Sequence, residues 1–337
     1  MKKAVIVTDV WSKNINGVVT AIVYTKKGLE DHGYQVTIIH PGLFHSLPLP
    51  SYAEIRLAIF TKKRIGEMLR QIKPDYIHIA TEGPLGLAAR TACVKRKWQF
   101  TTSYHTRFPE YITARIHLKP VEKIAWEYLR WFHSRSKKVM VSTPSLKKEL
   151  EKMRFKNVTV LPFGVELDLF KKNLKAKIPK SLQKPIFTFL GRIAPEKNLK
   201  AFLECDLPGT KLIIGDGPQR KKLERKFKEH TVFVGKKKGQ DIVDLLSISD
   251  VFVFPSKTDT FGLVLTEALA CELPVAAYNV HGPKDIITNG KDGFLGNNLA
   301  KNAIKCLDLN KENCRKKALK YSWDNFTNKF IKNIVHV

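Results

Sequence analysis

The chain has 337 residues, a hydrophobic share of 43% and a charged share of 27%, which exclude a disordered chain and are typical of a folded protein of about two domains. Its 59 basic and 31 acidic residues give a net charge of +28, spread over both halves, which favours anionic partners such as a membrane surface or a nucleic acid. No apolar run reaches the roughly 18 residues that span a bilayer, and the 5 cysteines form no Cys-x-x-Cys pair.

The first half of the chain predicts short strands that alternate with helical stretches. The strand segments are rich in Val and Ile and lie between turn residues, at 4–8, 35–40, 75–80, 99–104, 138–142 and 158–161. A helix is predicted from Val18 to Asp31, where the apolar periodicity ends before Gly33. This alternation predicts an α/β fold with a doubly wound parallel sheet.

The second half repeats the pattern, with strands predicted at 185–190, 210–215, 232–235, 250–255 and 275–278. Two Rossmann-like domains facing across a cleft are therefore expected. We place the first domain at 1–165, a Lys-rich linker at 166–184 and the second domain at 185–312. The last segment, 313–337, has apolar residues at helical spacing.

Candidate ligand-binding residues in the first half follow three of the predicted strands, because open α/β sheets bind ligands at the carboxyl ends of their strands. Asn16 and Gly17 lie in the loop after the first strand, Glu82 follows the third, and His105 and Arg107 follow the fourth. Glu82 is a candidate either for contact with a substrate or for capping the helix that follows it.

The second half carries a longer set of candidates. Arg192 and Lys197 lie in a strand-to-helix connection from which both cations can reach a diphosphate. Gly215 and Gly217 end another strand, where glycine permits a close backbone approach or merely a turn.

The most informative segment runs from residue 255 to residue 277. Asp259 and Glu267 stand eight positions apart, with Phe261 and Gly262 between them at the start of a predicted helix. A helix N-terminus favours an anion, and ionised carboxylates accept hydrogen bonds from hydroxyls. A ligand with both phosphates and a polyol fits this segment, which indicates a nucleotide sugar.

These motifs resemble the retaining GT-B glycosyltransferases of family 4, in which two acidic residues are separated by seven positions. The sequences Thr-Asp-Thr-Phe-Gly and Thr-Glu-Gly-Pro-Leu-Gly resemble those of the branch that holds sulfoquinovosyl, mannosyl and glucosyl transferases acting on lipids. That branch commonly has Asp at the first acidic position. The resemblance covers nearly the whole chain and implies that the terminal helix crosses back onto the first domain.

The resemblance also implies the roles of the candidates. Glu267 would hold the ribose of the donor, Asp259 the hydroxyls of the transferred sugar, and Arg192 with Lys197 the departing diphosphate. Gly215, Gly217, Phe261 and Gly262 would complete the donor site, with Gly17 near the donor phosphate. The acceptor would lie near Asn16, Glu82, His105 and Arg107, with His105 touching the transferred sugar.

We therefore expect a hexosyl or hexuronosyl transferase that needs no metal and no cofactor beyond its nucleotide-sugar co-substrate. UDP-glucose, UDP-glucuronate and GDP-mannose all remain possible donors. The expected acceptor is a membrane lipid such as diacylglycerol, reached from the cytoplasmic face of an anionic membrane. The alternatives are a soluble or polysaccharide acceptor, a nucleotide-sugar epimerase or phosphorylase on the same fold, and a basic nucleic-acid-binding protein, although no nucleic-acid recognition motif is found.

A helix predicted from Pro120 supports the membrane expectation. Its apolar stripe, which includes Ile124 and Leu129, is expected to pack in the core. Trp126 and Trp131 lie off that stripe together with basic residues, a combination suited to a lipid headgroup interface.

Overall fold

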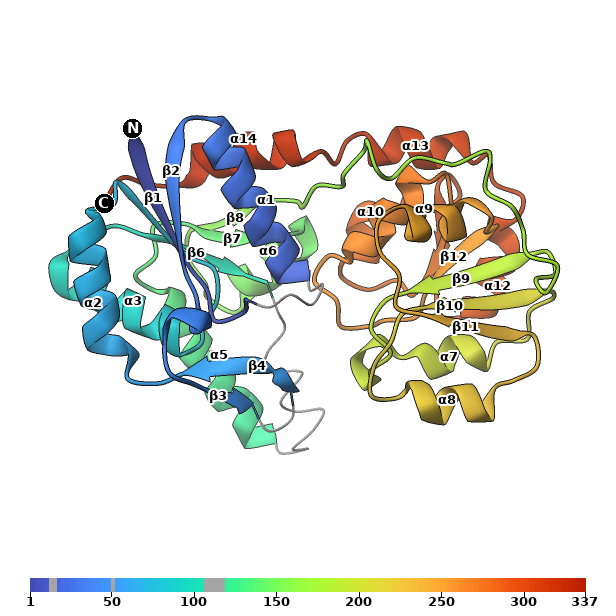
Figure 1. The fold of residues 1–337 in the computed structure, drawn as a ribbon, viewed down its shortest axis with the longest axis horizontal. Helices are drawn as coiled ribbons and strands as arrows, with labels where there is room; N and C mark the ends of the chain where they lie inside the picture. The colour runs from blue at the N-terminus through green and yellow to red at the C-terminus, as the bar shows by residue number, and fades with distance from the viewer. Residues whose placement is uncertain (12–16, 50–51, 106–118) are drawn as a thin grey trace. The chain divides into compact units, whose positions relative to one another are not determined.

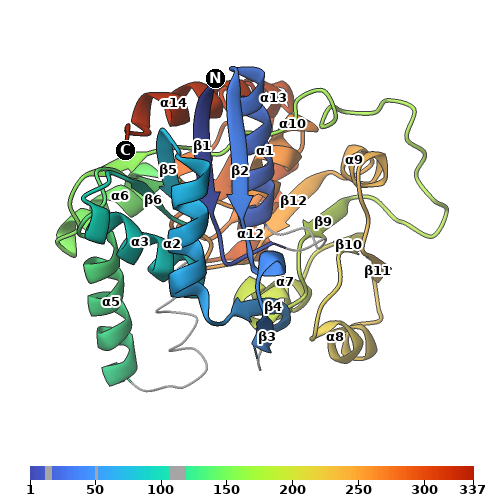
Figure 2. The same cartoon turned by 60° about the vertical axis from the view of Figure 1, so that its left-hand side comes forward.

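The computed structural model describes residues 1–11, 17–49, 52–105 and 119–337. The chain divides into two compact units: unit 1 comprises Met1–Pro162 and Trp323–Val337, and unit 2 comprises Phe163–Ser322. Each unit is built round one parallel sheet with helices on both faces (Figures 1 and 2). The predicted doubly wound α/β architecture is confirmed in both halves.

The sheet of unit 1 has the spatial order β2-β1-β5-β6-β7-β8 in the described part of the chain, and all of its neighbouring strands are parallel. Its strands are β1 (Lys2–Val7), β2 (Tyr34–Ile39), β5 (Tyr76–Ile79), β6 (Thr101–Tyr104), β7 (Val139–Val141) and β8 (Val158–Val160). An antiparallel hairpin of β3 (Ser46–Leu49) and β4 (Tyr52–Ala58) was not predicted.

The helices of unit 1 cover both faces of its sheet. They are α1 (Gly17–Asp31), the short helix η1 (Pro41–Leu43), α2 (Thr61–Ile72), α3 (Pro84–Arg96), α5 (Lys119–His133), α6 (Pro144–Lys152) and α14 (Trp323–Asn333). The terminal helix α14 lies along α1, where Trp323 stacks on Tyr24 with ring centroids 4.2 Å apart (Figure 1). The expected return of the chain to its first domain is therefore confirmed.

Unit 2 has the spatial strand order β11-β10-β9-β12-β13-β14, with parallel neighbours throughout its described residues. Its strands are β9 (Ile186–Leu190), β10 (Thr210–Ile214), β11 (Thr231–Gly235), β12 (Val251–Phe254), β13 (Val275–Ala277) and β14 (Gly293–Leu295), the last of which was not predicted. Its helices are η2 (Pro195–Lys197), α7 (Leu199–Leu203), α8 (Arg220–Lys226), α9 (Gln240–Ser247), α10 (Leu263–Ala270), α11 (Pro283–Ile286), α12 (Leu299–Cys306) and α13 (Glu312–Ala318).

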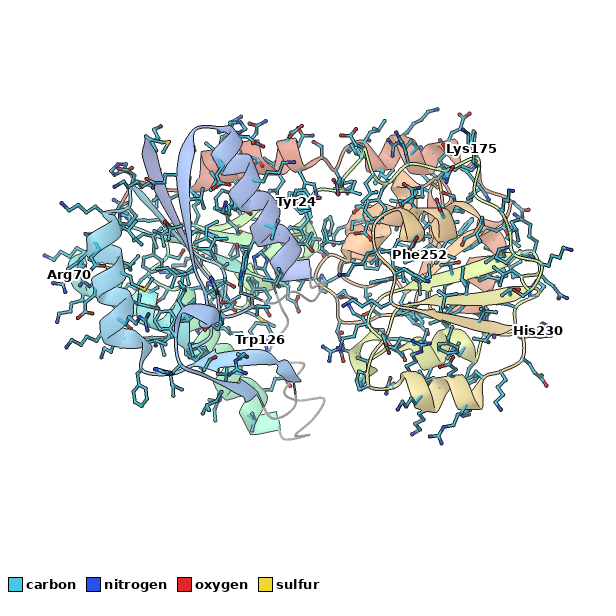
Figure 3. The ribbon with its side chains drawn as sticks, in the orientation of Figure 1. Tyr24, Arg70, Trp126, Lys175, His230 and Phe252 are labelled. Atoms are coloured by element: carbon cyan, nitrogen blue, oxygen red, sulfur yellow. The ribbon has the colours of Figure 1, made fainter. Side chains whose placement is uncertain are left out.

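In unit 2 the central strand β12 is apolar at every position and β9 at every position except Thr188, because helices cover both of their faces. In β9, Phe187 and Phe189 pack in one cluster with side chains of α7, α8 and α12. Figure 1 shows α9 and α10 on the other side of this sheet. Phe252 is fully buried inside unit 2, whereas Arg70 and Lys175 project outward from their units (Figure 3), which places these charges at the surface.

Candidate active site

Three loops of unit 2 meet at the carboxyl edge of its sheet. They follow the adjacent strands β10, β9 and β12, and the strand order reverses between β9 and β12. At such a reversal the two connections lead to helices on opposite faces of the sheet. Open α/β sheets bind their ligands in the crevice between these connections. The candidates Arg192, Lys197, Gly215, Gly217 and Asp259 all lie on these three loops.

The two glycines after β10 allow the first two loops to touch. A Cβ at Gly215 would lie 1.9 Å from the carbonyl oxygen of Gly191, and a Cβ at Gly217 would lie 2.4 Å from that of Ile193. The Ile193 N–H in turn donates to the Asp216 carbonyl at 2.8 Å. Glycine is therefore required here so that the loop carrying Arg192 can pack on its neighbour.

The loop after β12 is bound to the loop after β9 by side chains that the sequence did not single out. Asn198 Nδ2 donates to the Pro255 carbonyl at 3.1 Å, and its backbone adopts a left-handed conformation with φ of 52°. Ser256 Oγ and Thr258 Oγ1 both donate to the Glu196 carbonyl, at 3.2 and 3.3 Å. These bonds fix the segment that carries Lys197 against the segment that carries Asp259.

Lys197 and Asp259 form an ion pair at this edge. Lys197 Nζ donates to Asp259 Oδ1 at 2.5 Å, and the two side chains are 24% and 15% exposed. The second oxygen, Oδ2, is buried and has no hydrogen-bond partner among the described residues. A buried acceptor without a donor is costly, so this oxygen fits a ligand hydroxyl.

The residue before helix α10 is its N-cap, Gly262, whose left-handed backbone has φ of 86° and ψ of 75°. A Cβ there would lie 3.1 Å from the Phe254 ring, so the turn into α10 needs glycine. The Phe261 ring is 2% exposed and packs edge-to-face against Phe163 and Tyr321. Phe261 therefore anchors the turn from within the core.

Glu267 lies one turn inside α10. Burial raises the pKa of its carboxyl from 4.5 to about 7, because the surrounding protein disfavours the charged form. The residue as a whole is partly exposed. A buried carboxyl group of this kind is suited to accepting hydrogen bonds from the hydroxyls of a ligand, because such bonds stabilise its charged form.

The described candidates of unit 1, Gly17, Glu82 and His105, follow strands at the carboxyl edge of its own sheet. Gly17 is the exposed first residue of α1, and His105 follows β6. Burial lowers the pKa of His105 to about 4, so its imidazole is neutral at pH 7. Asn16 and Arg107 lie outside the described residues.

Glu82 does not cap the helix that follows it. The side chain that caps α3 is that of Asp9, two residues after β1, whose carboxylate accepts from the N–H groups of Leu85 at 2.7 Å and Gly86 at 3.3 Å. Burial raises the pKa of Asp9 despite these bonds. Instead, Glu82 Oε1 lies 3.3 Å from His133 Nε2. Asp9 and His133 were not singled out by the sequence analysis.

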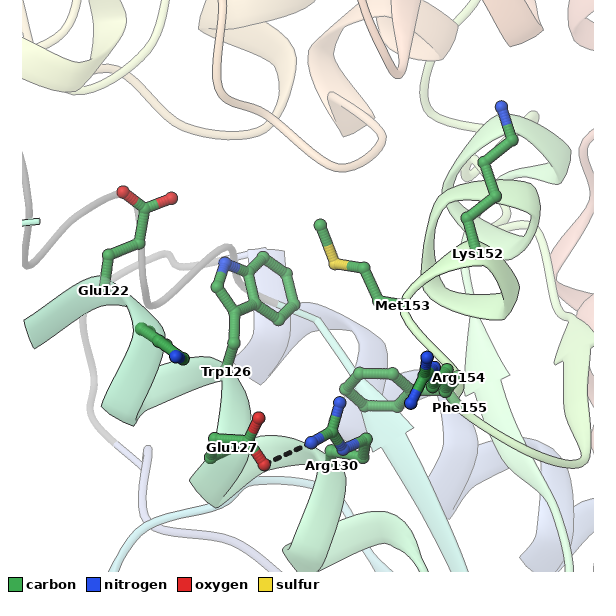
Figure 4. A pocket seen from close by; sticks show the side chains of 9 residues that line it. Glu122, Trp126, Glu127, Arg130, Lys152, Met153, Arg154 and Phe155 are labelled. Atoms are coloured by element: carbon green, nitrogen blue, oxygen red, sulfur yellow. Dashed lines mark hydrogen bonds and ion pairs between the residues drawn. The ribbon is translucent and has the colours of Figure 1, made fainter. Parts of the chain in front are cut away.

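A groove of about 420 Å³ lies between α5 and the end of α6 (Figure 4). Trp126, Met153 and Phe155 give it apolar walls, and basic side chains such as Arg130 and Arg154 line its rim. The prediction that Ile124 packs in the core is wrong, since its side chain is 68% exposed; Trp131, two turns further along α5, is 49% exposed. This helix therefore presents more apolar surface than the sequence indicated.

Two further findings concern the described residues alone. Within them, no group of three or more His, Cys, Asp or Glu side chains has a metal-binding arrangement. None of the helices in that part of the chain has the length and apolar character of a membrane span.

Comparison with known families identifies the two halves separately. The profile of Glycosyltransferase Family 4 matches residues 15–169, and that of Glycosyl transferases group 1 matches residues 170–308. The chain belongs to the glycosyltransferases that these two profiles describe. The sulfoquinovosyl transferase of Arabidopsis thaliana is 29% identical over 82% of this chain, which spans 56% of that protein's length.

Bacterial relatives match more of their own length. A GDP-mannose-dependent alpha-mannosyltransferase of Corynebacterium glutamicum is 25% identical over 87% of this chain and 76% of its own. An alpha-monoglucosyldiacylglycerol synthase of Acholeplasma laidlawii is 28% identical over 84% and 82%. The solved sucrose-phosphate synthase of Thermosynechococcus elongatus has a TM-score of 0.77 at 17% identity over 98% of both chains, which confirms the GT-B fold.

Proposed function

We propose that this glycosyltransferase moves a hexosyl or hexuronosyl unit from a nucleotide-diphosphate sugar to a hydroxyl of a membrane lipid, with retention of the anomeric configuration. The observation that carries the donor half of this proposal is the Lys197–Asp259 pair, with its buried and unpartnered Oδ2, at the strand-order reversal of unit 2. Lys197 is a cation that can bind a diphosphate, and Asp259 Oδ2 beside it can accept a hydrogen bond from a sugar hydroxyl.

The donor roles follow from these contacts. Asp259 Oδ2 accepts from a hydroxyl of the transferred sugar, while Lys197 keeps one N–H on Oδ1 and turns its others to the diphosphate, since an ammonium has three donors. Arg192, held by the packing of the glycine loops, adds a bidentate fork to the same phosphates. Glu267 accepts from the ribose hydroxyls.

The transfer step needs little beyond these groups. The acceptor oxygen bonds the anomeric carbon as the bond from that carbon to the diphosphate breaks, and the hydroxyl proton passes to the departing phosphate oxygen. Lys197 and Arg192 stabilise the negative charge that develops on the diphosphate, which is the work a divalent cation does elsewhere. We therefore propose a metal-independent reaction.

In unit 1, the neutral His105 offers a hydrogen bond to the transferred sugar without adding positive charge next to the anomeric carbon. Gly17 opens α1, and the partial positive charge at this helix N-terminus suits the donor phosphate. Both assignments rest on family resemblance and on position at the carboxyl edge of the unit 1 sheet.

The lipid acceptor is supported by α5 and by the relatives. Ile124 and Trp131 are exposed seven residues apart, hence on one side of the helix, and basic side chains adjoin them. One of the matching relatives is named as a synthase of a glucosyl lipid, alpha-monoglucosyldiacylglycerol, and another as a sulfoquinovosyl transferase. The net charge of +28 suits an anionic surface at the cytoplasmic face of a membrane.

The test is transfer from UDP-glucose, UDP-glucuronate and GDP-mannose, each offered diacylglycerol in anionic vesicles or a soluble sugar. We expect a glycolipid product with one of the three donors, and the configuration at its anomeric carbon reports retention. Transfer to the soluble sugar alone would refute the lipid acceptor. Isomerised donor without an acceptor would indicate an epimerase instead.

A further inference from the structure

A buried chain of polar groups runs from Glu82 into the core of unit 1. Glu82 Oε1 lies 3.3 Å from His133 Nε2, and the imidazole is 1% exposed while the carboxyl group is 17% exposed. The other ring nitrogen, Nδ1, lies 2.8 Å from Thr102 Oγ1. Thr102 Oγ1 lies 3.0 Å from Ser136 Oγ, which lies 2.6 Å from the Lys138 carbonyl oxygen.

The direction of every hydrogen bond in this chain is fixed by its inner end. The Lys138 carbonyl can only accept, so the hydroxyl of Ser136 donates to it. Ser136 must then accept from Thr102, because a hydroxyl has one hydrogen. The Thr102 hydroxyl has likewise given its hydrogen away, so it accepts from His133, and the Nδ1 atom of that ring carries a proton.

This assignment leaves one proton to account for. A neutral imidazole protonated at Nδ1 has a lone pair at Nε2, which would face a lone pair of an ionised Glu82 Oε1. The contact is a hydrogen bond only if an additional proton lies between the two atoms. An imidazole binds a proton more tightly than a carboxylate does in water, which places that proton on the ring.

We infer that His133 is a positioning residue, a doubly protonated imidazolium that holds Oε1 of Glu82 and leaves Oε2 to receive the acceptor hydroxyl. The Glu82 backbone is held as well, since the Tyr128 hydroxyl donates to its carbonyl at 2.5 Å. Such a Glu82 orients the hydroxyl through a hydrogen bond and remains ionised. The role towards the acceptor rests on the proposed function, whereas the proton on His133 does not.

The other charged and titratable groups around the pair keep their own partners. Arg90 donates to the backbone carbonyls of Trp131 and Phe132, at 2.9 and 2.8 Å. Asp9 is occupied by the N-terminus of α3 and by Thr81. Tyr128 is held un-ionised, because burial raises the pKa of its hydroxyl to about 12.

The direct test is nitrogen-15 NMR of the protein labelled at histidine, near pH 7 and without substrate. We expect two protonated ring nitrogens for His133. His78 is the internal control: it is also buried and also bonded at both nitrogens, to Thr101 Oγ1 and Ser103 Oγ, but it has no carboxylate partner. Burial lowers the pKa of His78 to about 3, so its ring should show one protonated nitrogen.

Two variants change the proton pattern in opposite ways. In Glu82→Gln the amide donates to Nε2, so His133 should keep only its Nδ1 proton. In Ser136→Ala the Thr102 hydroxyl is released to donate to Nδ1, so the ring should keep only its Nε2 proton. A wild-type His133 with a single protonated nitrogen would overturn the inference, and so would a pattern that neither variant changes.

The positioning role has its own readout. His133→Gln should raise the KM for the acceptor about tenfold, the size expected when a charge-assisted hydrogen bond is lost, and leave the KM for the donor unchanged. An unchanged acceptor KM, or an equal rise for both substrates, would refute that role. Because the NMR experiment uses no substrate, failure of the proposed transferase activity would leave its result readable.

Discussion

Substituting Gly215 by Ala tests whether the packing of two glycine loops builds the donor site. The added Cβ would lie 1.9 Å from the Gly191 carbonyl oxygen, and the φ of Gly215 is 143°. Neither loop can move freely, because backbone hydrogen bonds hold both. The Gly191 N–H donates to the Ile214 carbonyl at 3.0 Å, and the Gly215 N–H donates to the Gly235 carbonyl at 2.9 Å. The steric overlap must therefore strain both backbones.

The magnitude follows from a matched control in the same unit. Gly290 also has a positive φ, 77°, but a Cβ there meets nothing nearer than the Phe294 ring at 4.0 Å. Gly290→Ala should cost only the left-handed backbone term of about 1–2 kcal/mol. Gly215→Ala adds an overpacking term of about 1–3 kcal/mol, so its midpoint should lie about 2–12 °C below that of the control.

The assay uses the distribution of tryptophan between the units. All 5 tryptophans lie in unit 1, at Trp11, Trp98, Trp126, Trp131 and Trp323. Far-UV circular dichroism reports both units, whereas tryptophan fluorescence reports unit 1. We expect the dichroism midpoint of Gly215→Ala to fall, together with a loss of affinity for nucleoside diphosphates. Equal midpoints and equal affinities for the two variants would refute the reasoning.

Four further outcomes are expected. Arg192→Ala should keep its fold and lose at least tenfold in turnover, about 2–4 kcal/mol of transition-state stabilisation; a wild-type rate in a steady-state assay would contradict its assignment. Glu267→Gln should raise the free energy of unfolding at pH 8 by about 3 kcal/mol, because it removes a desolvated charge. That gain should shrink as the pH falls below about 7 and vanish near 4.5, where the wild-type carboxyl is protonated in both states; a pH-independent difference in urea titrations would exclude this origin. Activity should survive EDTA, and loss that Mg²⁺ restores would show that Lys197 and Arg192 do not suffice. In flotation assays the protein should bind vesicles containing phosphatidylglycerol, less at high salt, and Trp131→Ala should weaken this binding; equal binding to neutral vesicles would count against the basic surface.

Local sequence patterns predicted the parallel sheets and most of the candidate residues for donor binding. Strand and helix follow from periodicity along a few residues, and each candidate loop follows a buried strand at a point where ligands bind. The same reasoning failed for Ile124, whose helical spacing fits an apolar stripe although its side chain is 68% exposed. Spacing shows which residues share a face, but only the neighbouring elements decide whether that face is covered.

The sequence by itself determined that Asp259 and Glu267 occupy a loop and the helix after it, because their spacing is local to one turn and one helix. Only the tertiary structure decided which residues they and the other candidates meet. Lys197 reaches Asp259 across 62 positions, Glu82 meets His133 across 51, and Asp9 caps α3 across 76. Such contacts depend on the order of strands in each sheet, which no short stretch of sequence encodes.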